Sequence, residues 1–388
     1  MKTERKLLLA CLQFELGSRS LEDLSNALQA KDLDSKQFAK FLLRHRLVQQ
    51  VYATLKKAPI DTHSIENALK QLNLQITLKQ LANTAQLTKI VAAFEEQSIS
   101  FICLKGSALG VLLYGAAEKR QSNDIDILVQ ESDLRAAESV LAHLGFKYDE
   151  FSSDSPTKDK FEIHKNHTHH LHFSKGDLVV EVHWKTSSHN YLYPKPFEEL
   201  YQKRTHIPIA NQNVPFLSTE DLIAYLHIHG IAHCWNRMKL IYEVALLRQK
   251  DPQVFDTLTN RPEPSPLRQA FKTYQALSHQ LFDYGPSPQK SLKTSILTSL
   301  ACSQMLGDNE LLDSLPNTLG RSASIFLTIP DIPNRIRYTN QLLSWTPLYH
   351  KLPLPKYFHF VYPLISPALW FCRAIRRVFT PEKRKVKQ

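Results

Sequence analysis

The period of the hydrophobic pattern changes twice along this chain, and these changes constrain the fold more than any other feature. Up to Gln97, apolar residues recur at helical spacing, as at Leu43, Leu47 and Val51, and glycine is almost absent. From Ser98 to about residue 190, short apolar runs alternate with polar residues and glycine-containing turns, a pattern typical of strands. Helical spacing then returns. The pattern predicts an α+β fold, with a small mixed β-sheet flanked by N-terminal and C-terminal helical regions.

Four regions follow from this division. We predict an N-terminal helical region over 1–98, a sheet region over 99–190, a C-terminal helical region over 191–379 and a basic tail over 380–388. Serines suited to helix N-caps predict helix starts at Ser20, Ser35, Ser64 and Ser218. The predicted strands cover 98–103, 125–129, 146–150, 169–174 and 178–185. Residues 251–267 hold four prolines and predict a linker or long loop.

Basic residues are concentrated at the C-terminal end. From Arg373 to Gln388 there are seven Lys or Arg and one Glu, so this stretch carries +6 of the net +11 and leaves +5 for the rest. A nucleic-acid-binding face on the body is therefore not expected. With the aromatic residues before it, the tail is suited to peripheral contact with an anionic membrane surface, and a solvated tail is the simpler alternative.

The positions of glycine and cysteine exclude several classes of protein. The ten glycines have no spacing that fits GxGxxG, GxxxxGK or GxSxG. The five cysteines are scattered without a CxxC pair, which argues against a disulfide framework or a cysteine zinc site and favours a reducing compartment. Gln13 and Glu15 interrupt the first apolar run, so a signal peptide is not expected. These features predict a cytoplasmic protein.

Three acidic residues lie on predicted strands. Asp124 and Asp126 are separated by one residue, so in a strand both side chains point to the same face. Two neighbouring carboxylates repel unless a cation relieves them, and Mg²⁺ prefers such hard oxygen ligands. Glu181 lies within a run of valines, where an acid is unusual as a structural residue. If its strand lies beside that of Asp124, Glu181 becomes the third carboxylate of one site.

A small-residue turn precedes these carboxylates. Lys105, Gly106 and Ser107 follow a predicted strand and begin a predicted helix, an arrangement that suits phosphate binding at a helix N-terminus. Arg120 is four residues before Asp124, and an ion pair with that aspartate is its simplest structural interpretation.

A longer set of residues, taken in order, carries a resemblance to a known family. The set is Leu104-Lys105-Gly106-Ser107, Tyr114, Arg120, Asp124-Ile125-Asp126-Ile127-Leu128-Val129, Gly145-Phe146, His169-His170-Leu171, Val180-Glu181-Val182-His183-Trp184, and the histidine-rich segment 226–237 that ends at Arg237. Over roughly residues 40 to 250, this set resembles the bacterial family of uncharacterised nucleotidyltransferases, within the superfamily related to DNA polymerase beta. Two departures are Gly115-Ala116-Ala117, where the family often has prolines, and Glu243, where it often has Asp.

The resemblance implies a nucleotidyltransferase-like sheet and a two-metal transfer reaction. Asp124, Asp126 and Glu181 would bind Mg²⁺, or Mn²⁺, and a nucleoside monophosphate would move from an NTP, ATP first, to a hydroxyl acceptor. The acceptor would be a small molecule, sugar, peptide or protein. Gly106 and Ser107 would contact the nucleotide's phosphates. Lys105 and Arg120 would offset the charge that develops in the transition state.

Histidines gather near this predicted site. His170, His172 and His183 are predicted to share one face of the sheet, and a zinc site there would still need an acid or cysteine, which the sequence does not place with them. His229 and His233 have the i, i+4 spacing of a helical ligand pair, but Gly230 stands where a zinc protease needs Glu. We therefore assign His170, His183, His229, His233 and Arg237 to the acceptor side of the cleft, with packing as the alternative.

Two other functions fit part of this pattern. A metal-dependent glycosyltransferase also uses Asp-x-Asp to bind a metal–nucleotide, but the Gly106-Ser107 turn and Glu181 argue against it. A catalytically inactive nucleotide-binding or scaffold protein could keep the same fold, but retention of all three carboxylates argues against this.

Overall fold

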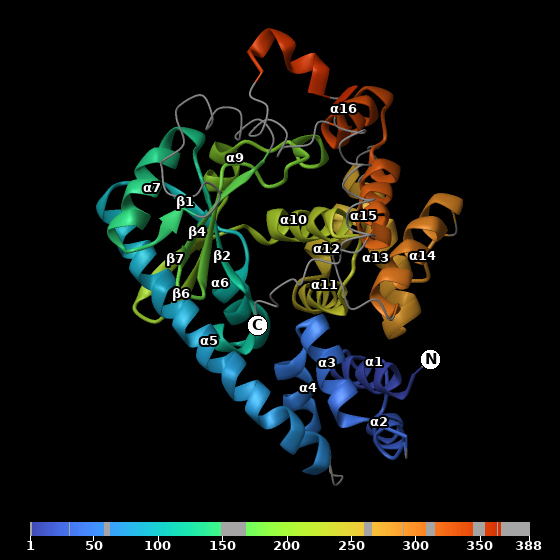
Figure 1. Cartoon of the computed structure of the whole chain (residues 1–388). Coiled ribbons are helices and arrows are strands. Elements are labelled where there is room, and N and C mark those ends of the chain that lie inside the picture. The colour runs from blue at the N-terminus through green and yellow to red at the C-terminus, as the bar shows by residue number, and fades with distance from the viewer. Residues whose placement is uncertain are drawn as a thin grey trace.

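The computed structural model describes most of the chain (Figure 1). The described residues are 2–30, 32–57, 63–148, 168–259, 266–289, 291–307, 315–343, 354–362 and 364–365. The basic tail, and therefore its predicted membrane contact, lies outside these residues. Helices cover a mixed seven-stranded sheet, which confirms the predicted α+β class.

The N-terminal region is helical, as predicted. Its helices are α1 (Thr3–Glu15), α2 (Leu21–Leu28), α3 (Ser35–His45), α4 (Val48–Leu55) and α5 (His63–Glu96). Ser20 caps α2 through a reciprocal pair of hydrogen bonds with Asp23, so this predicted start is confirmed. The helix that begins at Ser35 is shorter than its hydrophobic pattern suggests. It ends at Arg46, whose backbone is left-handed with φ 56°, and α4 then follows as a separate helix.

The sheet has the strand order β3-β4-β5-β2-β1-β7-β6. Its strands are β1 (Phe101–Cys103), β2 (Asp124–Val129), β3 (Lys147–Tyr148), β4 (His170–Lys175), β5 (Leu178–His183), β6 (Thr205–Ile209) and β7 (Gln212–Phe216). Both β2–β5 and β1–β7 are parallel pairs, and the other pairs are antiparallel. Gly176 has φ 60° and closes the predicted β4–β5 hairpin.

The sheet extends past the predicted boundary at residue 190. Strands β6 and β7 lie in the region that the sequence analysis treated as helical, and β7 pairs with β1. Pro208 and Pro215 lie within these strands, and proline weakens the sequence signal of a strand because it cannot donate to the ladder. The edge position of β6 tolerates its proline.

Helices and short 3₁₀ turns connect the strands. They are α6 (Gly106–Tyr114), η1 (Ala117–Lys119), η2 (Glu131–Asp133), α7 (Leu134–His143), η3 (Asn190–Leu192) and α9 (Phe197–Gln202). The long α5 contacts β2, β7 and α7, and Figure 1 shows it running from the N-terminal helices along the sheet.

The C-terminal region is helical from Thr219. It comprises α10 (Thr219–Ala232), α11 (Met238–Lys250), α12 (Pro252–Thr259), α13 (Pro266–Phe282), α14 (Leu292–Leu306), α15 (Leu315–Thr328), α16 (Ile332–Leu343) and η4 (Lys356–Val361). Ser218 caps α10 by accepting from the Asp221 N–H at 3.2 Å, as predicted. The expected linker is partly wrong, because Pro252 begins α12. Within the described ranges, no helix has both the length and the apolarity to cross a membrane.

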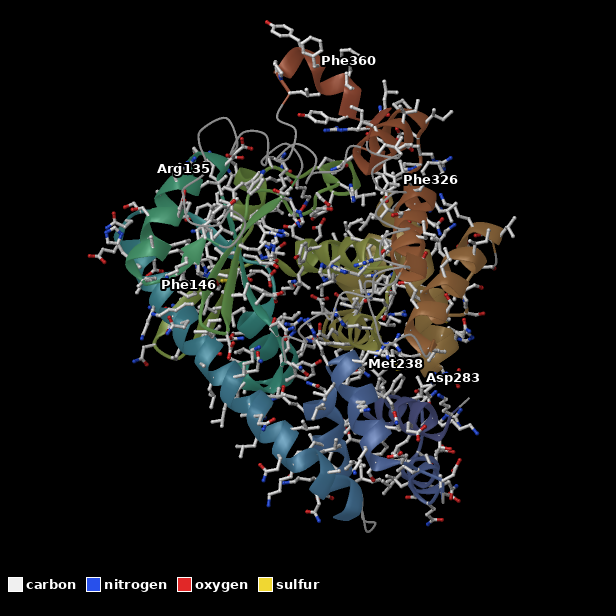
Figure 2. The ribbon with its side chains drawn as sticks, viewed as in Figure 1. Arg135, Phe146, Met238, Asp283, Phe326 and Phe360 are labelled. Atoms are coloured by element: carbon white, nitrogen blue, oxygen red, sulfur yellow. The ribbon has the colours of Figure 1, made fainter. Side chains whose placement is uncertain are left out.

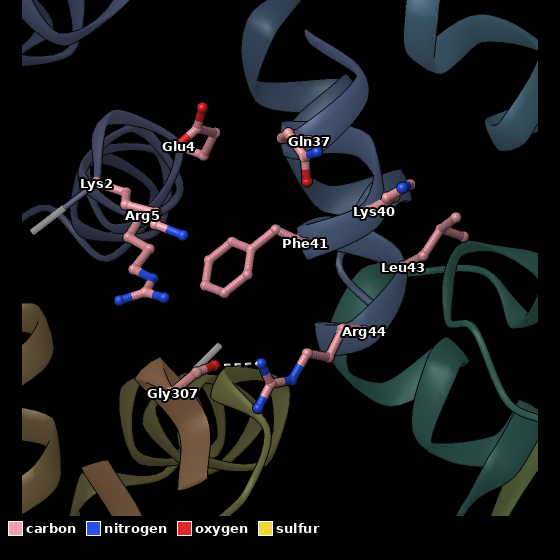
Figure 3. A pocket seen from close by; sticks show the side chains of 9 residues that line it. All are labelled: Lys2, Glu4, Arg5, Gln37, Lys40, Phe41, Leu43, Arg44 and Gly307. Atoms are coloured by element: carbon pink, nitrogen blue, oxygen red, sulfur yellow. Dashed lines mark hydrogen bonds between the residues drawn. The ribbon is translucent and has the colours of Figure 1, made fainter. Parts of the chain in front are cut away.

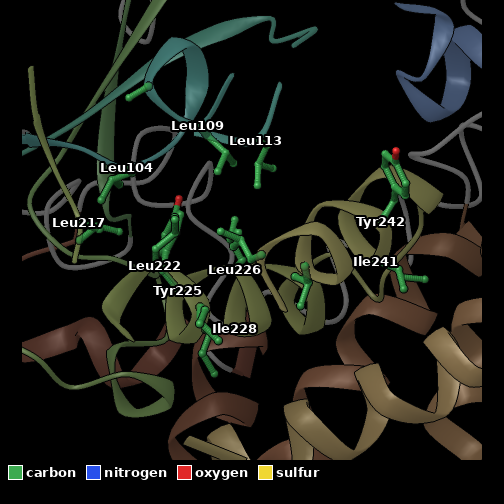
Figure 4. Packing of buried hydrophobic residues seen from close by; sticks show 14 of the residues in the cluster. Leu104, Leu109, Leu113, Leu217, Leu222, Tyr225, Leu226, Ile228, Ile241 and Tyr242 are labelled. Carbon is green, nitrogen blue, oxygen red and sulfur yellow. The ribbon is translucent and has the colours of Figure 1, made fainter. Parts of the chain in front are cut away.

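One continuous apolar core joins these regions. It includes Leu8 of α1, Phe94 of α5, Ile127 of β2 and Ile231 of α10, all buried. Figure 4 shows Leu222 and Leu226 of α10 lying opposite Leu109 of α6. Burial of this apolar surface fixes α10 beside the sheet, and α10 carries several of the predicted site residues.

Candidate active site

The parallel pairing of β2 and β5 brings the predicted carboxylates together. Asp126 lies opposite Glu181 in the register, and Asp124 lies opposite Val179. Since paired residues in neighbouring strands point to the same face, Asp124, Asp126 and Glu181 share one face of the sheet. Ile125 and Val180 occupy the opposite, buried face. The sequence-based placement of Glu181 beside the two aspartates is therefore found in the structure.

The side-chain nitrogens of a lysine and a histidine contact these carboxylates. Lys105 Nζ lies 3.1 Å from Asp126 Oδ1. His183 Nε2 lies 3.3 Å from Asp126 Oδ1 and 3.3 Å from Glu181 Oε2, so one imidazole nitrogen lies between two acids. Asp126 and His183 are both almost fully buried, which strengthens these interactions.

The pKa values of these groups reflect this mutual stabilisation. Burial opposes charge on Lys105, but Asp126 and Asp124 outweigh it and raise its pKa. Burial also opposes charge on His183, while hydrogen bonds to Asp126 and Glu181 raise its pKa overall. For Glu181, burial is offset by the His183 hydrogen bond, which lowers its pKa. Lys105 therefore stays protonated and Glu181 stays ionised at neutral pH.

The donor set fits a divalent metal ion. Asp126, Glu181 and His183 offer ligand atoms that all lie within 4.8 Å of one another. The second carboxylate oxygen of Asp126, Oδ2, is buried and has no hydrogen-bond partner among the described residues. An unpaired buried carboxylate oxygen is costly without a cation. Asp124 is a further oxygen donor on the same face, and its Oδ1 accepts from Ser122 Oγ at 3.0 Å.

The predicted phosphate turn lies beside these acids. Gly106 has φ 66°, a left-handed conformation that favours glycine, and it begins α6 directly after Lys105. Ser107 is nearly buried, and its hydroxyl lies 3.0 Å from the Thr84 hydroxyl of α5. The N-terminal end of α6, with its positive dipole end, thus lies next to Lys105 and the carboxylate face.

A row of aromatic side chains on α10 runs past Lys105. Tyr225, His229 and His233 are four residues apart, so they share one helical face. The Tyr225 and His229 rings stack at 5.9 Å between centroids, and His229 and His233 are 4.4 Å apart. Burial and the charge of Lys105 lower the pKa of His229 and bring that of His233 to about 3, so both are neutral. Both histidines of the predicted pair therefore lie near Lys105.

Histidines of β4 extend the carboxylate face. His172 lies opposite Glu181 and His170 opposite His183 in the antiparallel register. His170 Nε2 and His172 Nε2 are 2.8 Å apart, and both lie within ligand-to-ligand reach of Glu181. Burial lowers the pKa of His170 to about 3, which keeps its ring neutral. The sequence analysis missed that Glu181 supplies an acid to these histidines, because that contact depends on strand register.

Arg120 pairs with a different acid from Asp124, the ion-pair partner that the sequence analysis considered. Its guanidinium forms a two-point ion pair with Glu243 of α11, at 2.8 and 3.0 Å. Lys239 lies 3.5 Å from the same carboxylate. Burial opposes ionisation of Glu243, but Arg120 and Lys239 lower its pKa overall. Arg120 thus ties the segment before β2 to α11, and its hydrogen-bonded ion pair is with Glu243 rather than with Asp124.

Sequence reasoning named Arg237 but missed Arg46. Both are half-buried, and neither side chain makes a hydrogen bond or ion pair with any residue the structure describes. The only sequence signal for Arg46 was weak, since an arginine beside a helical stripe is usually a solvated surface residue. The structure shows it in a left-handed conformation at the end of α3.

A cavity of about 600 Å³ lies between α1 and α3, apart from the carboxylates (Figure 3). Its lining residues are Lys2, Glu4, Arg5, Gln37, Lys40, Phe41, Leu43, Arg44 and Gly307. Arg44 donates to the Gly307 carbonyl at 2.6 Å, which joins α3 to the end of α14. None of the predicted site residues lines this cavity.

Comparison with known proteins identifies one family. The model of a family described as uncharacterised nucleotidyltransferase matches residues 31–283. Among solved structures, the solution structure of the antibiotic-resistance factor ANT(2'')-Ia is similar, with 18% sequence identity and a TM-score of 0.35. That alignment covers 53% of this chain and 100% of the other chain. The search of curated proteins gave no match.

Proposed function

The chain belongs to the uncharacterised nucleotidyltransferase family, and from this premise we propose that it transfers a nucleoside monophosphate from an NTP to a hydroxyl acceptor at Asp124, Asp126 and Glu181. Membership of this family supports nucleotidyl transfer, and it argues against a metal-dependent glycosyltransferase. ATP as the donor and a small molecule, sugar, peptide or protein as the acceptor are the further parts of the proposal. The observation that carries the proposal is the β2–β5 register, which places Asp126 opposite Glu181. Lys105, from the turn before α6, contacts the same Asp126.

The proposed reaction forms a bond between the acceptor oxygen and the α-phosphorus and releases pyrophosphate. Asp124, Asp126 and Glu181 would hold Mg²⁺ or Mn²⁺, which when bound polarises the phosphoryl oxygens and lowers the pKa of the acceptor hydroxyl. His183 holds Asp126 and Glu181 in place through its Nε2. The proton of the acceptor hydroxyl is released to solvent as the new bond forms.

The nucleotide's phosphates would bind at the start of α6. Backbone N–H groups of Gly106 and Ser107 supply donors there, and Lys105 supplies a fixed positive charge. Such preorganised donors stabilise charge that develops in the transition state. Arg120 would support this phosphate site indirectly, because its ion pair with Glu243 holds the segment before β2 against α11. On the acceptor side, His170, His183, His229, His233 and Arg237 would contact the acceptor. The scattered free cysteines among the described residues support a reducing, cytoplasmic location.

The first test is thermal unfolding with ATP, GTP, CTP and UTP, each with and without Mg²⁺. A ligand at a hundred times its Kd stabilises by about 2.7 kcal/mol, so the midpoint rises by several degrees. We predict a Mg²⁺-dependent rise with one or more nucleotides in the wild type and none in Asp126→Asn. Asp177→Asn, an exposed acid at the β4–β5 turn, is the matched control and should behave as wild type.

Transfer itself is followed with the stabilising nucleotide, labelled at the α-phosphate. Label that moves to an acceptor in wild type and Asp177→Asn, but not in Asp126→Asn, supports the enzyme. Binding without any transfer across acceptor classes would support a nucleotide-binding protein without turnover. Equal thermal shifts in wild type and Asp126→Asn would contradict the proposed site.

A further inference from the structure

The turn between α10 and α11 is held in a strained conformation. Cys234 and Trp235 both have left-handed backbones, with φ 51° and 47°, which side chains with a Cβ rarely adopt. Trp235 is fully buried and its indole packs closely against Gly230, where an added Cβ would lie 2.5 Å from the ring. Such strain persists only where surrounding packing enforces it, and it is common at binding sites. The turn ends at Arg237.

Three other parts of the chain meet at this turn. Lys239 donates to the Gln121 carbonyl, just before β2. The His45 ring, at the end of α3, accepts from the Met238 N–H at 3.1 Å, and Figure 2 shows Met238 where α11 meets the N-terminal helices. Ser324 of α15 donates to the Ile231 carbonyl at 3.2 Å.

These contacts gather arginines from separate elements. Arg237 is next to Met238 and Arg46 is next to His45, so the Met238–His45 hydrogen bond brings these segments together, and the charges of Arg46 and Arg321 act on Arg237. Arg321 lies one turn before Ser324 on α15, on the same side. Arg237 Nε is buried without a hydrogen bond among the described residues. Burial and then Arg46 lower the pKa of Arg237 to about 10, while Asp124 acts in the opposite direction. Arg237 therefore remains charged at neutral pH.

We propose that Arg46 and Arg237, with Arg321 beside them, form a subsite for a phosphoryl oxyanion next to the carboxylate face. Guanidinium groups bind phosphate oxygens through paired, charge-assisted hydrogen bonds. These two half-buried guanidiniums have no carboxylate partner among the described residues, so they repel each other, and a bound phosphoryl group relieves this repulsion. The subsite rests on the proposed function and adds to it, because it assigns a second phosphate position distinct from the start of α6.

A phosphoryl group at this position has two sources. It is either the β- and γ-phosphates of the nucleotide, which leave as pyrophosphate, or a phosphate carried by the acceptor. Both sources require the same two arginines. If the subsite binds the nucleotide's own phosphates, bound pyrophosphate fills it. If it binds a phosphate of the acceptor, it stays open to inorganic phosphate after pyrophosphate has bound.

The experiment is calorimetric titration of the full chain, in Mg²⁺, with pyrophosphate and then with inorganic phosphate. It compares wild type, Arg46→Gln and Arg237→Gln, with Arg135→Gln as control because Arg135 is an exposed arginine on α7 (Figure 2). We expect each of the two test variants to weaken anion binding at least about tenfold, the usual effect of losing one charge-assisted contact. Arg135→Gln should bind as wild type.

The two arms separate the sources. If Arg46→Gln and Arg237→Gln weaken pyrophosphate, the site binds the nucleotide's own phosphates. If pyrophosphate is unaffected, but phosphate binds to the pyrophosphate-saturated wild type and not to these variants, the site binds a phosphorylated acceptor. Affinities that agree within about twofold across all four proteins, or no anion binding to wild type at millimolar concentration, overturn the subsite. In that case Asp126→Asn would still test the nucleotide site independently.

Discussion

Lys105 neutralises the buried Asp126 carboxylate when no metal ion is bound. Its Nζ lies 3.1 Å from Asp126 Oδ1, and the Asp126 side chain is fully buried. Removing one partner of a buried ion pair costs about 3–5 kcal/mol, because the other charge stays buried without compensation. For Lys105→Met we therefore predict a midpoint several degrees below wild type when EDTA is present. Mg²⁺ should restore more stability to the variant than it adds to wild type, since the metal takes over neutralisation of Asp126.

Differential scanning calorimetry in EDTA and in Mg²⁺ measures both effects. Lys70→Met, which removes an exposed lysine from α5, is the control for loss of a surface charge. Identical midpoints for Lys105→Met and wild type in EDTA would show that the Lys105–Asp126 contact does not stabilise the fold.

Individual site residues could be predicted from the sequence where their position depends only on the local pattern of a strand. Asp124 and Asp126 share a face because strand side chains alternate, and Glu181 stood out because an acid among valines is unusual. The hydrogen-bond and ion-pair partners of these residues could not be predicted from local pattern. His183 between two acids, and Arg120 on Glu243, depend on contacts 57 and 123 residues apart in the sequence. Arg46 carried only a weak local signal.

At the scale of elements, the strained turn after α10 gives a prediction. Alanine at Gly230 would place its Cβ 2.5 Å from the Trp235 indole. Overpacking of this kind typically costs about 1–3 kcal/mol, and here the indole must move and take the turn with it. We predict that Gly230→Ala lowers the free energy of unfolding by that amount and weakens pyrophosphate binding, because Arg237 shifts. Urea unfolding and calorimetric titration measure the two effects.

A second variant separates the clash from other effects of alanine. The close atoms belong to the six-membered ring of the Trp235 indole. Combining Gly230→Ala with Trp235→Phe should therefore cost less than the sum of the single changes, because the smaller ring makes room for the Cβ. Additive losses would mean that Gly230 does not act through Trp235.

The same scale shows why some elements were predictable and others were not. Strands β1, β2, β4 and β5 have dense apolar runs and clear turns, so their positions were predicted to within a few residues. Strands β6 and β7 carry prolines and polar residues, and their pairing with β1 stabilises them. The break between α3 and α4 was not predictable, because Arg46 adopts a conformation that sequence patterns assign to glycine or asparagine.

At the scale of the whole molecule, a few buried polar contacts join the N-terminal helices to the C-terminal ones. The most enclosed is His45, which has no exposed surface and whose Nδ1 accepts from the Met238 N–H. Burial, together with the nearby charges of Arg44 and Arg237, lowers the pKa of His45 to about 3. Protonation of Nδ1 would both break the hydrogen bond and bury a charge, so His45 is neutral in the folded state.

This contact makes stability depend on pH in a defined direction. An unfolded histidine has a pKa of about 6.5, so below that value the unfolded chain binds a proton that folded His45 does not. The stability it contributes is present above about pH 6.5 and is lost as the pH falls toward about 3, by about 1.4 kcal/mol per pH unit. We predict that His45→Gln, whose side-chain oxygen can still accept from Met238, has a shallower slope by about that amount. Urea unfolding at several values from roughly pH 7 to 5 gives the slopes, and His143→Gln, on the exposed end of α7, controls for loss of a surface imidazole. Parallel slopes for wild type and His45→Gln would mean that protonation of His45 does not lower the free energy of unfolding at acidic pH.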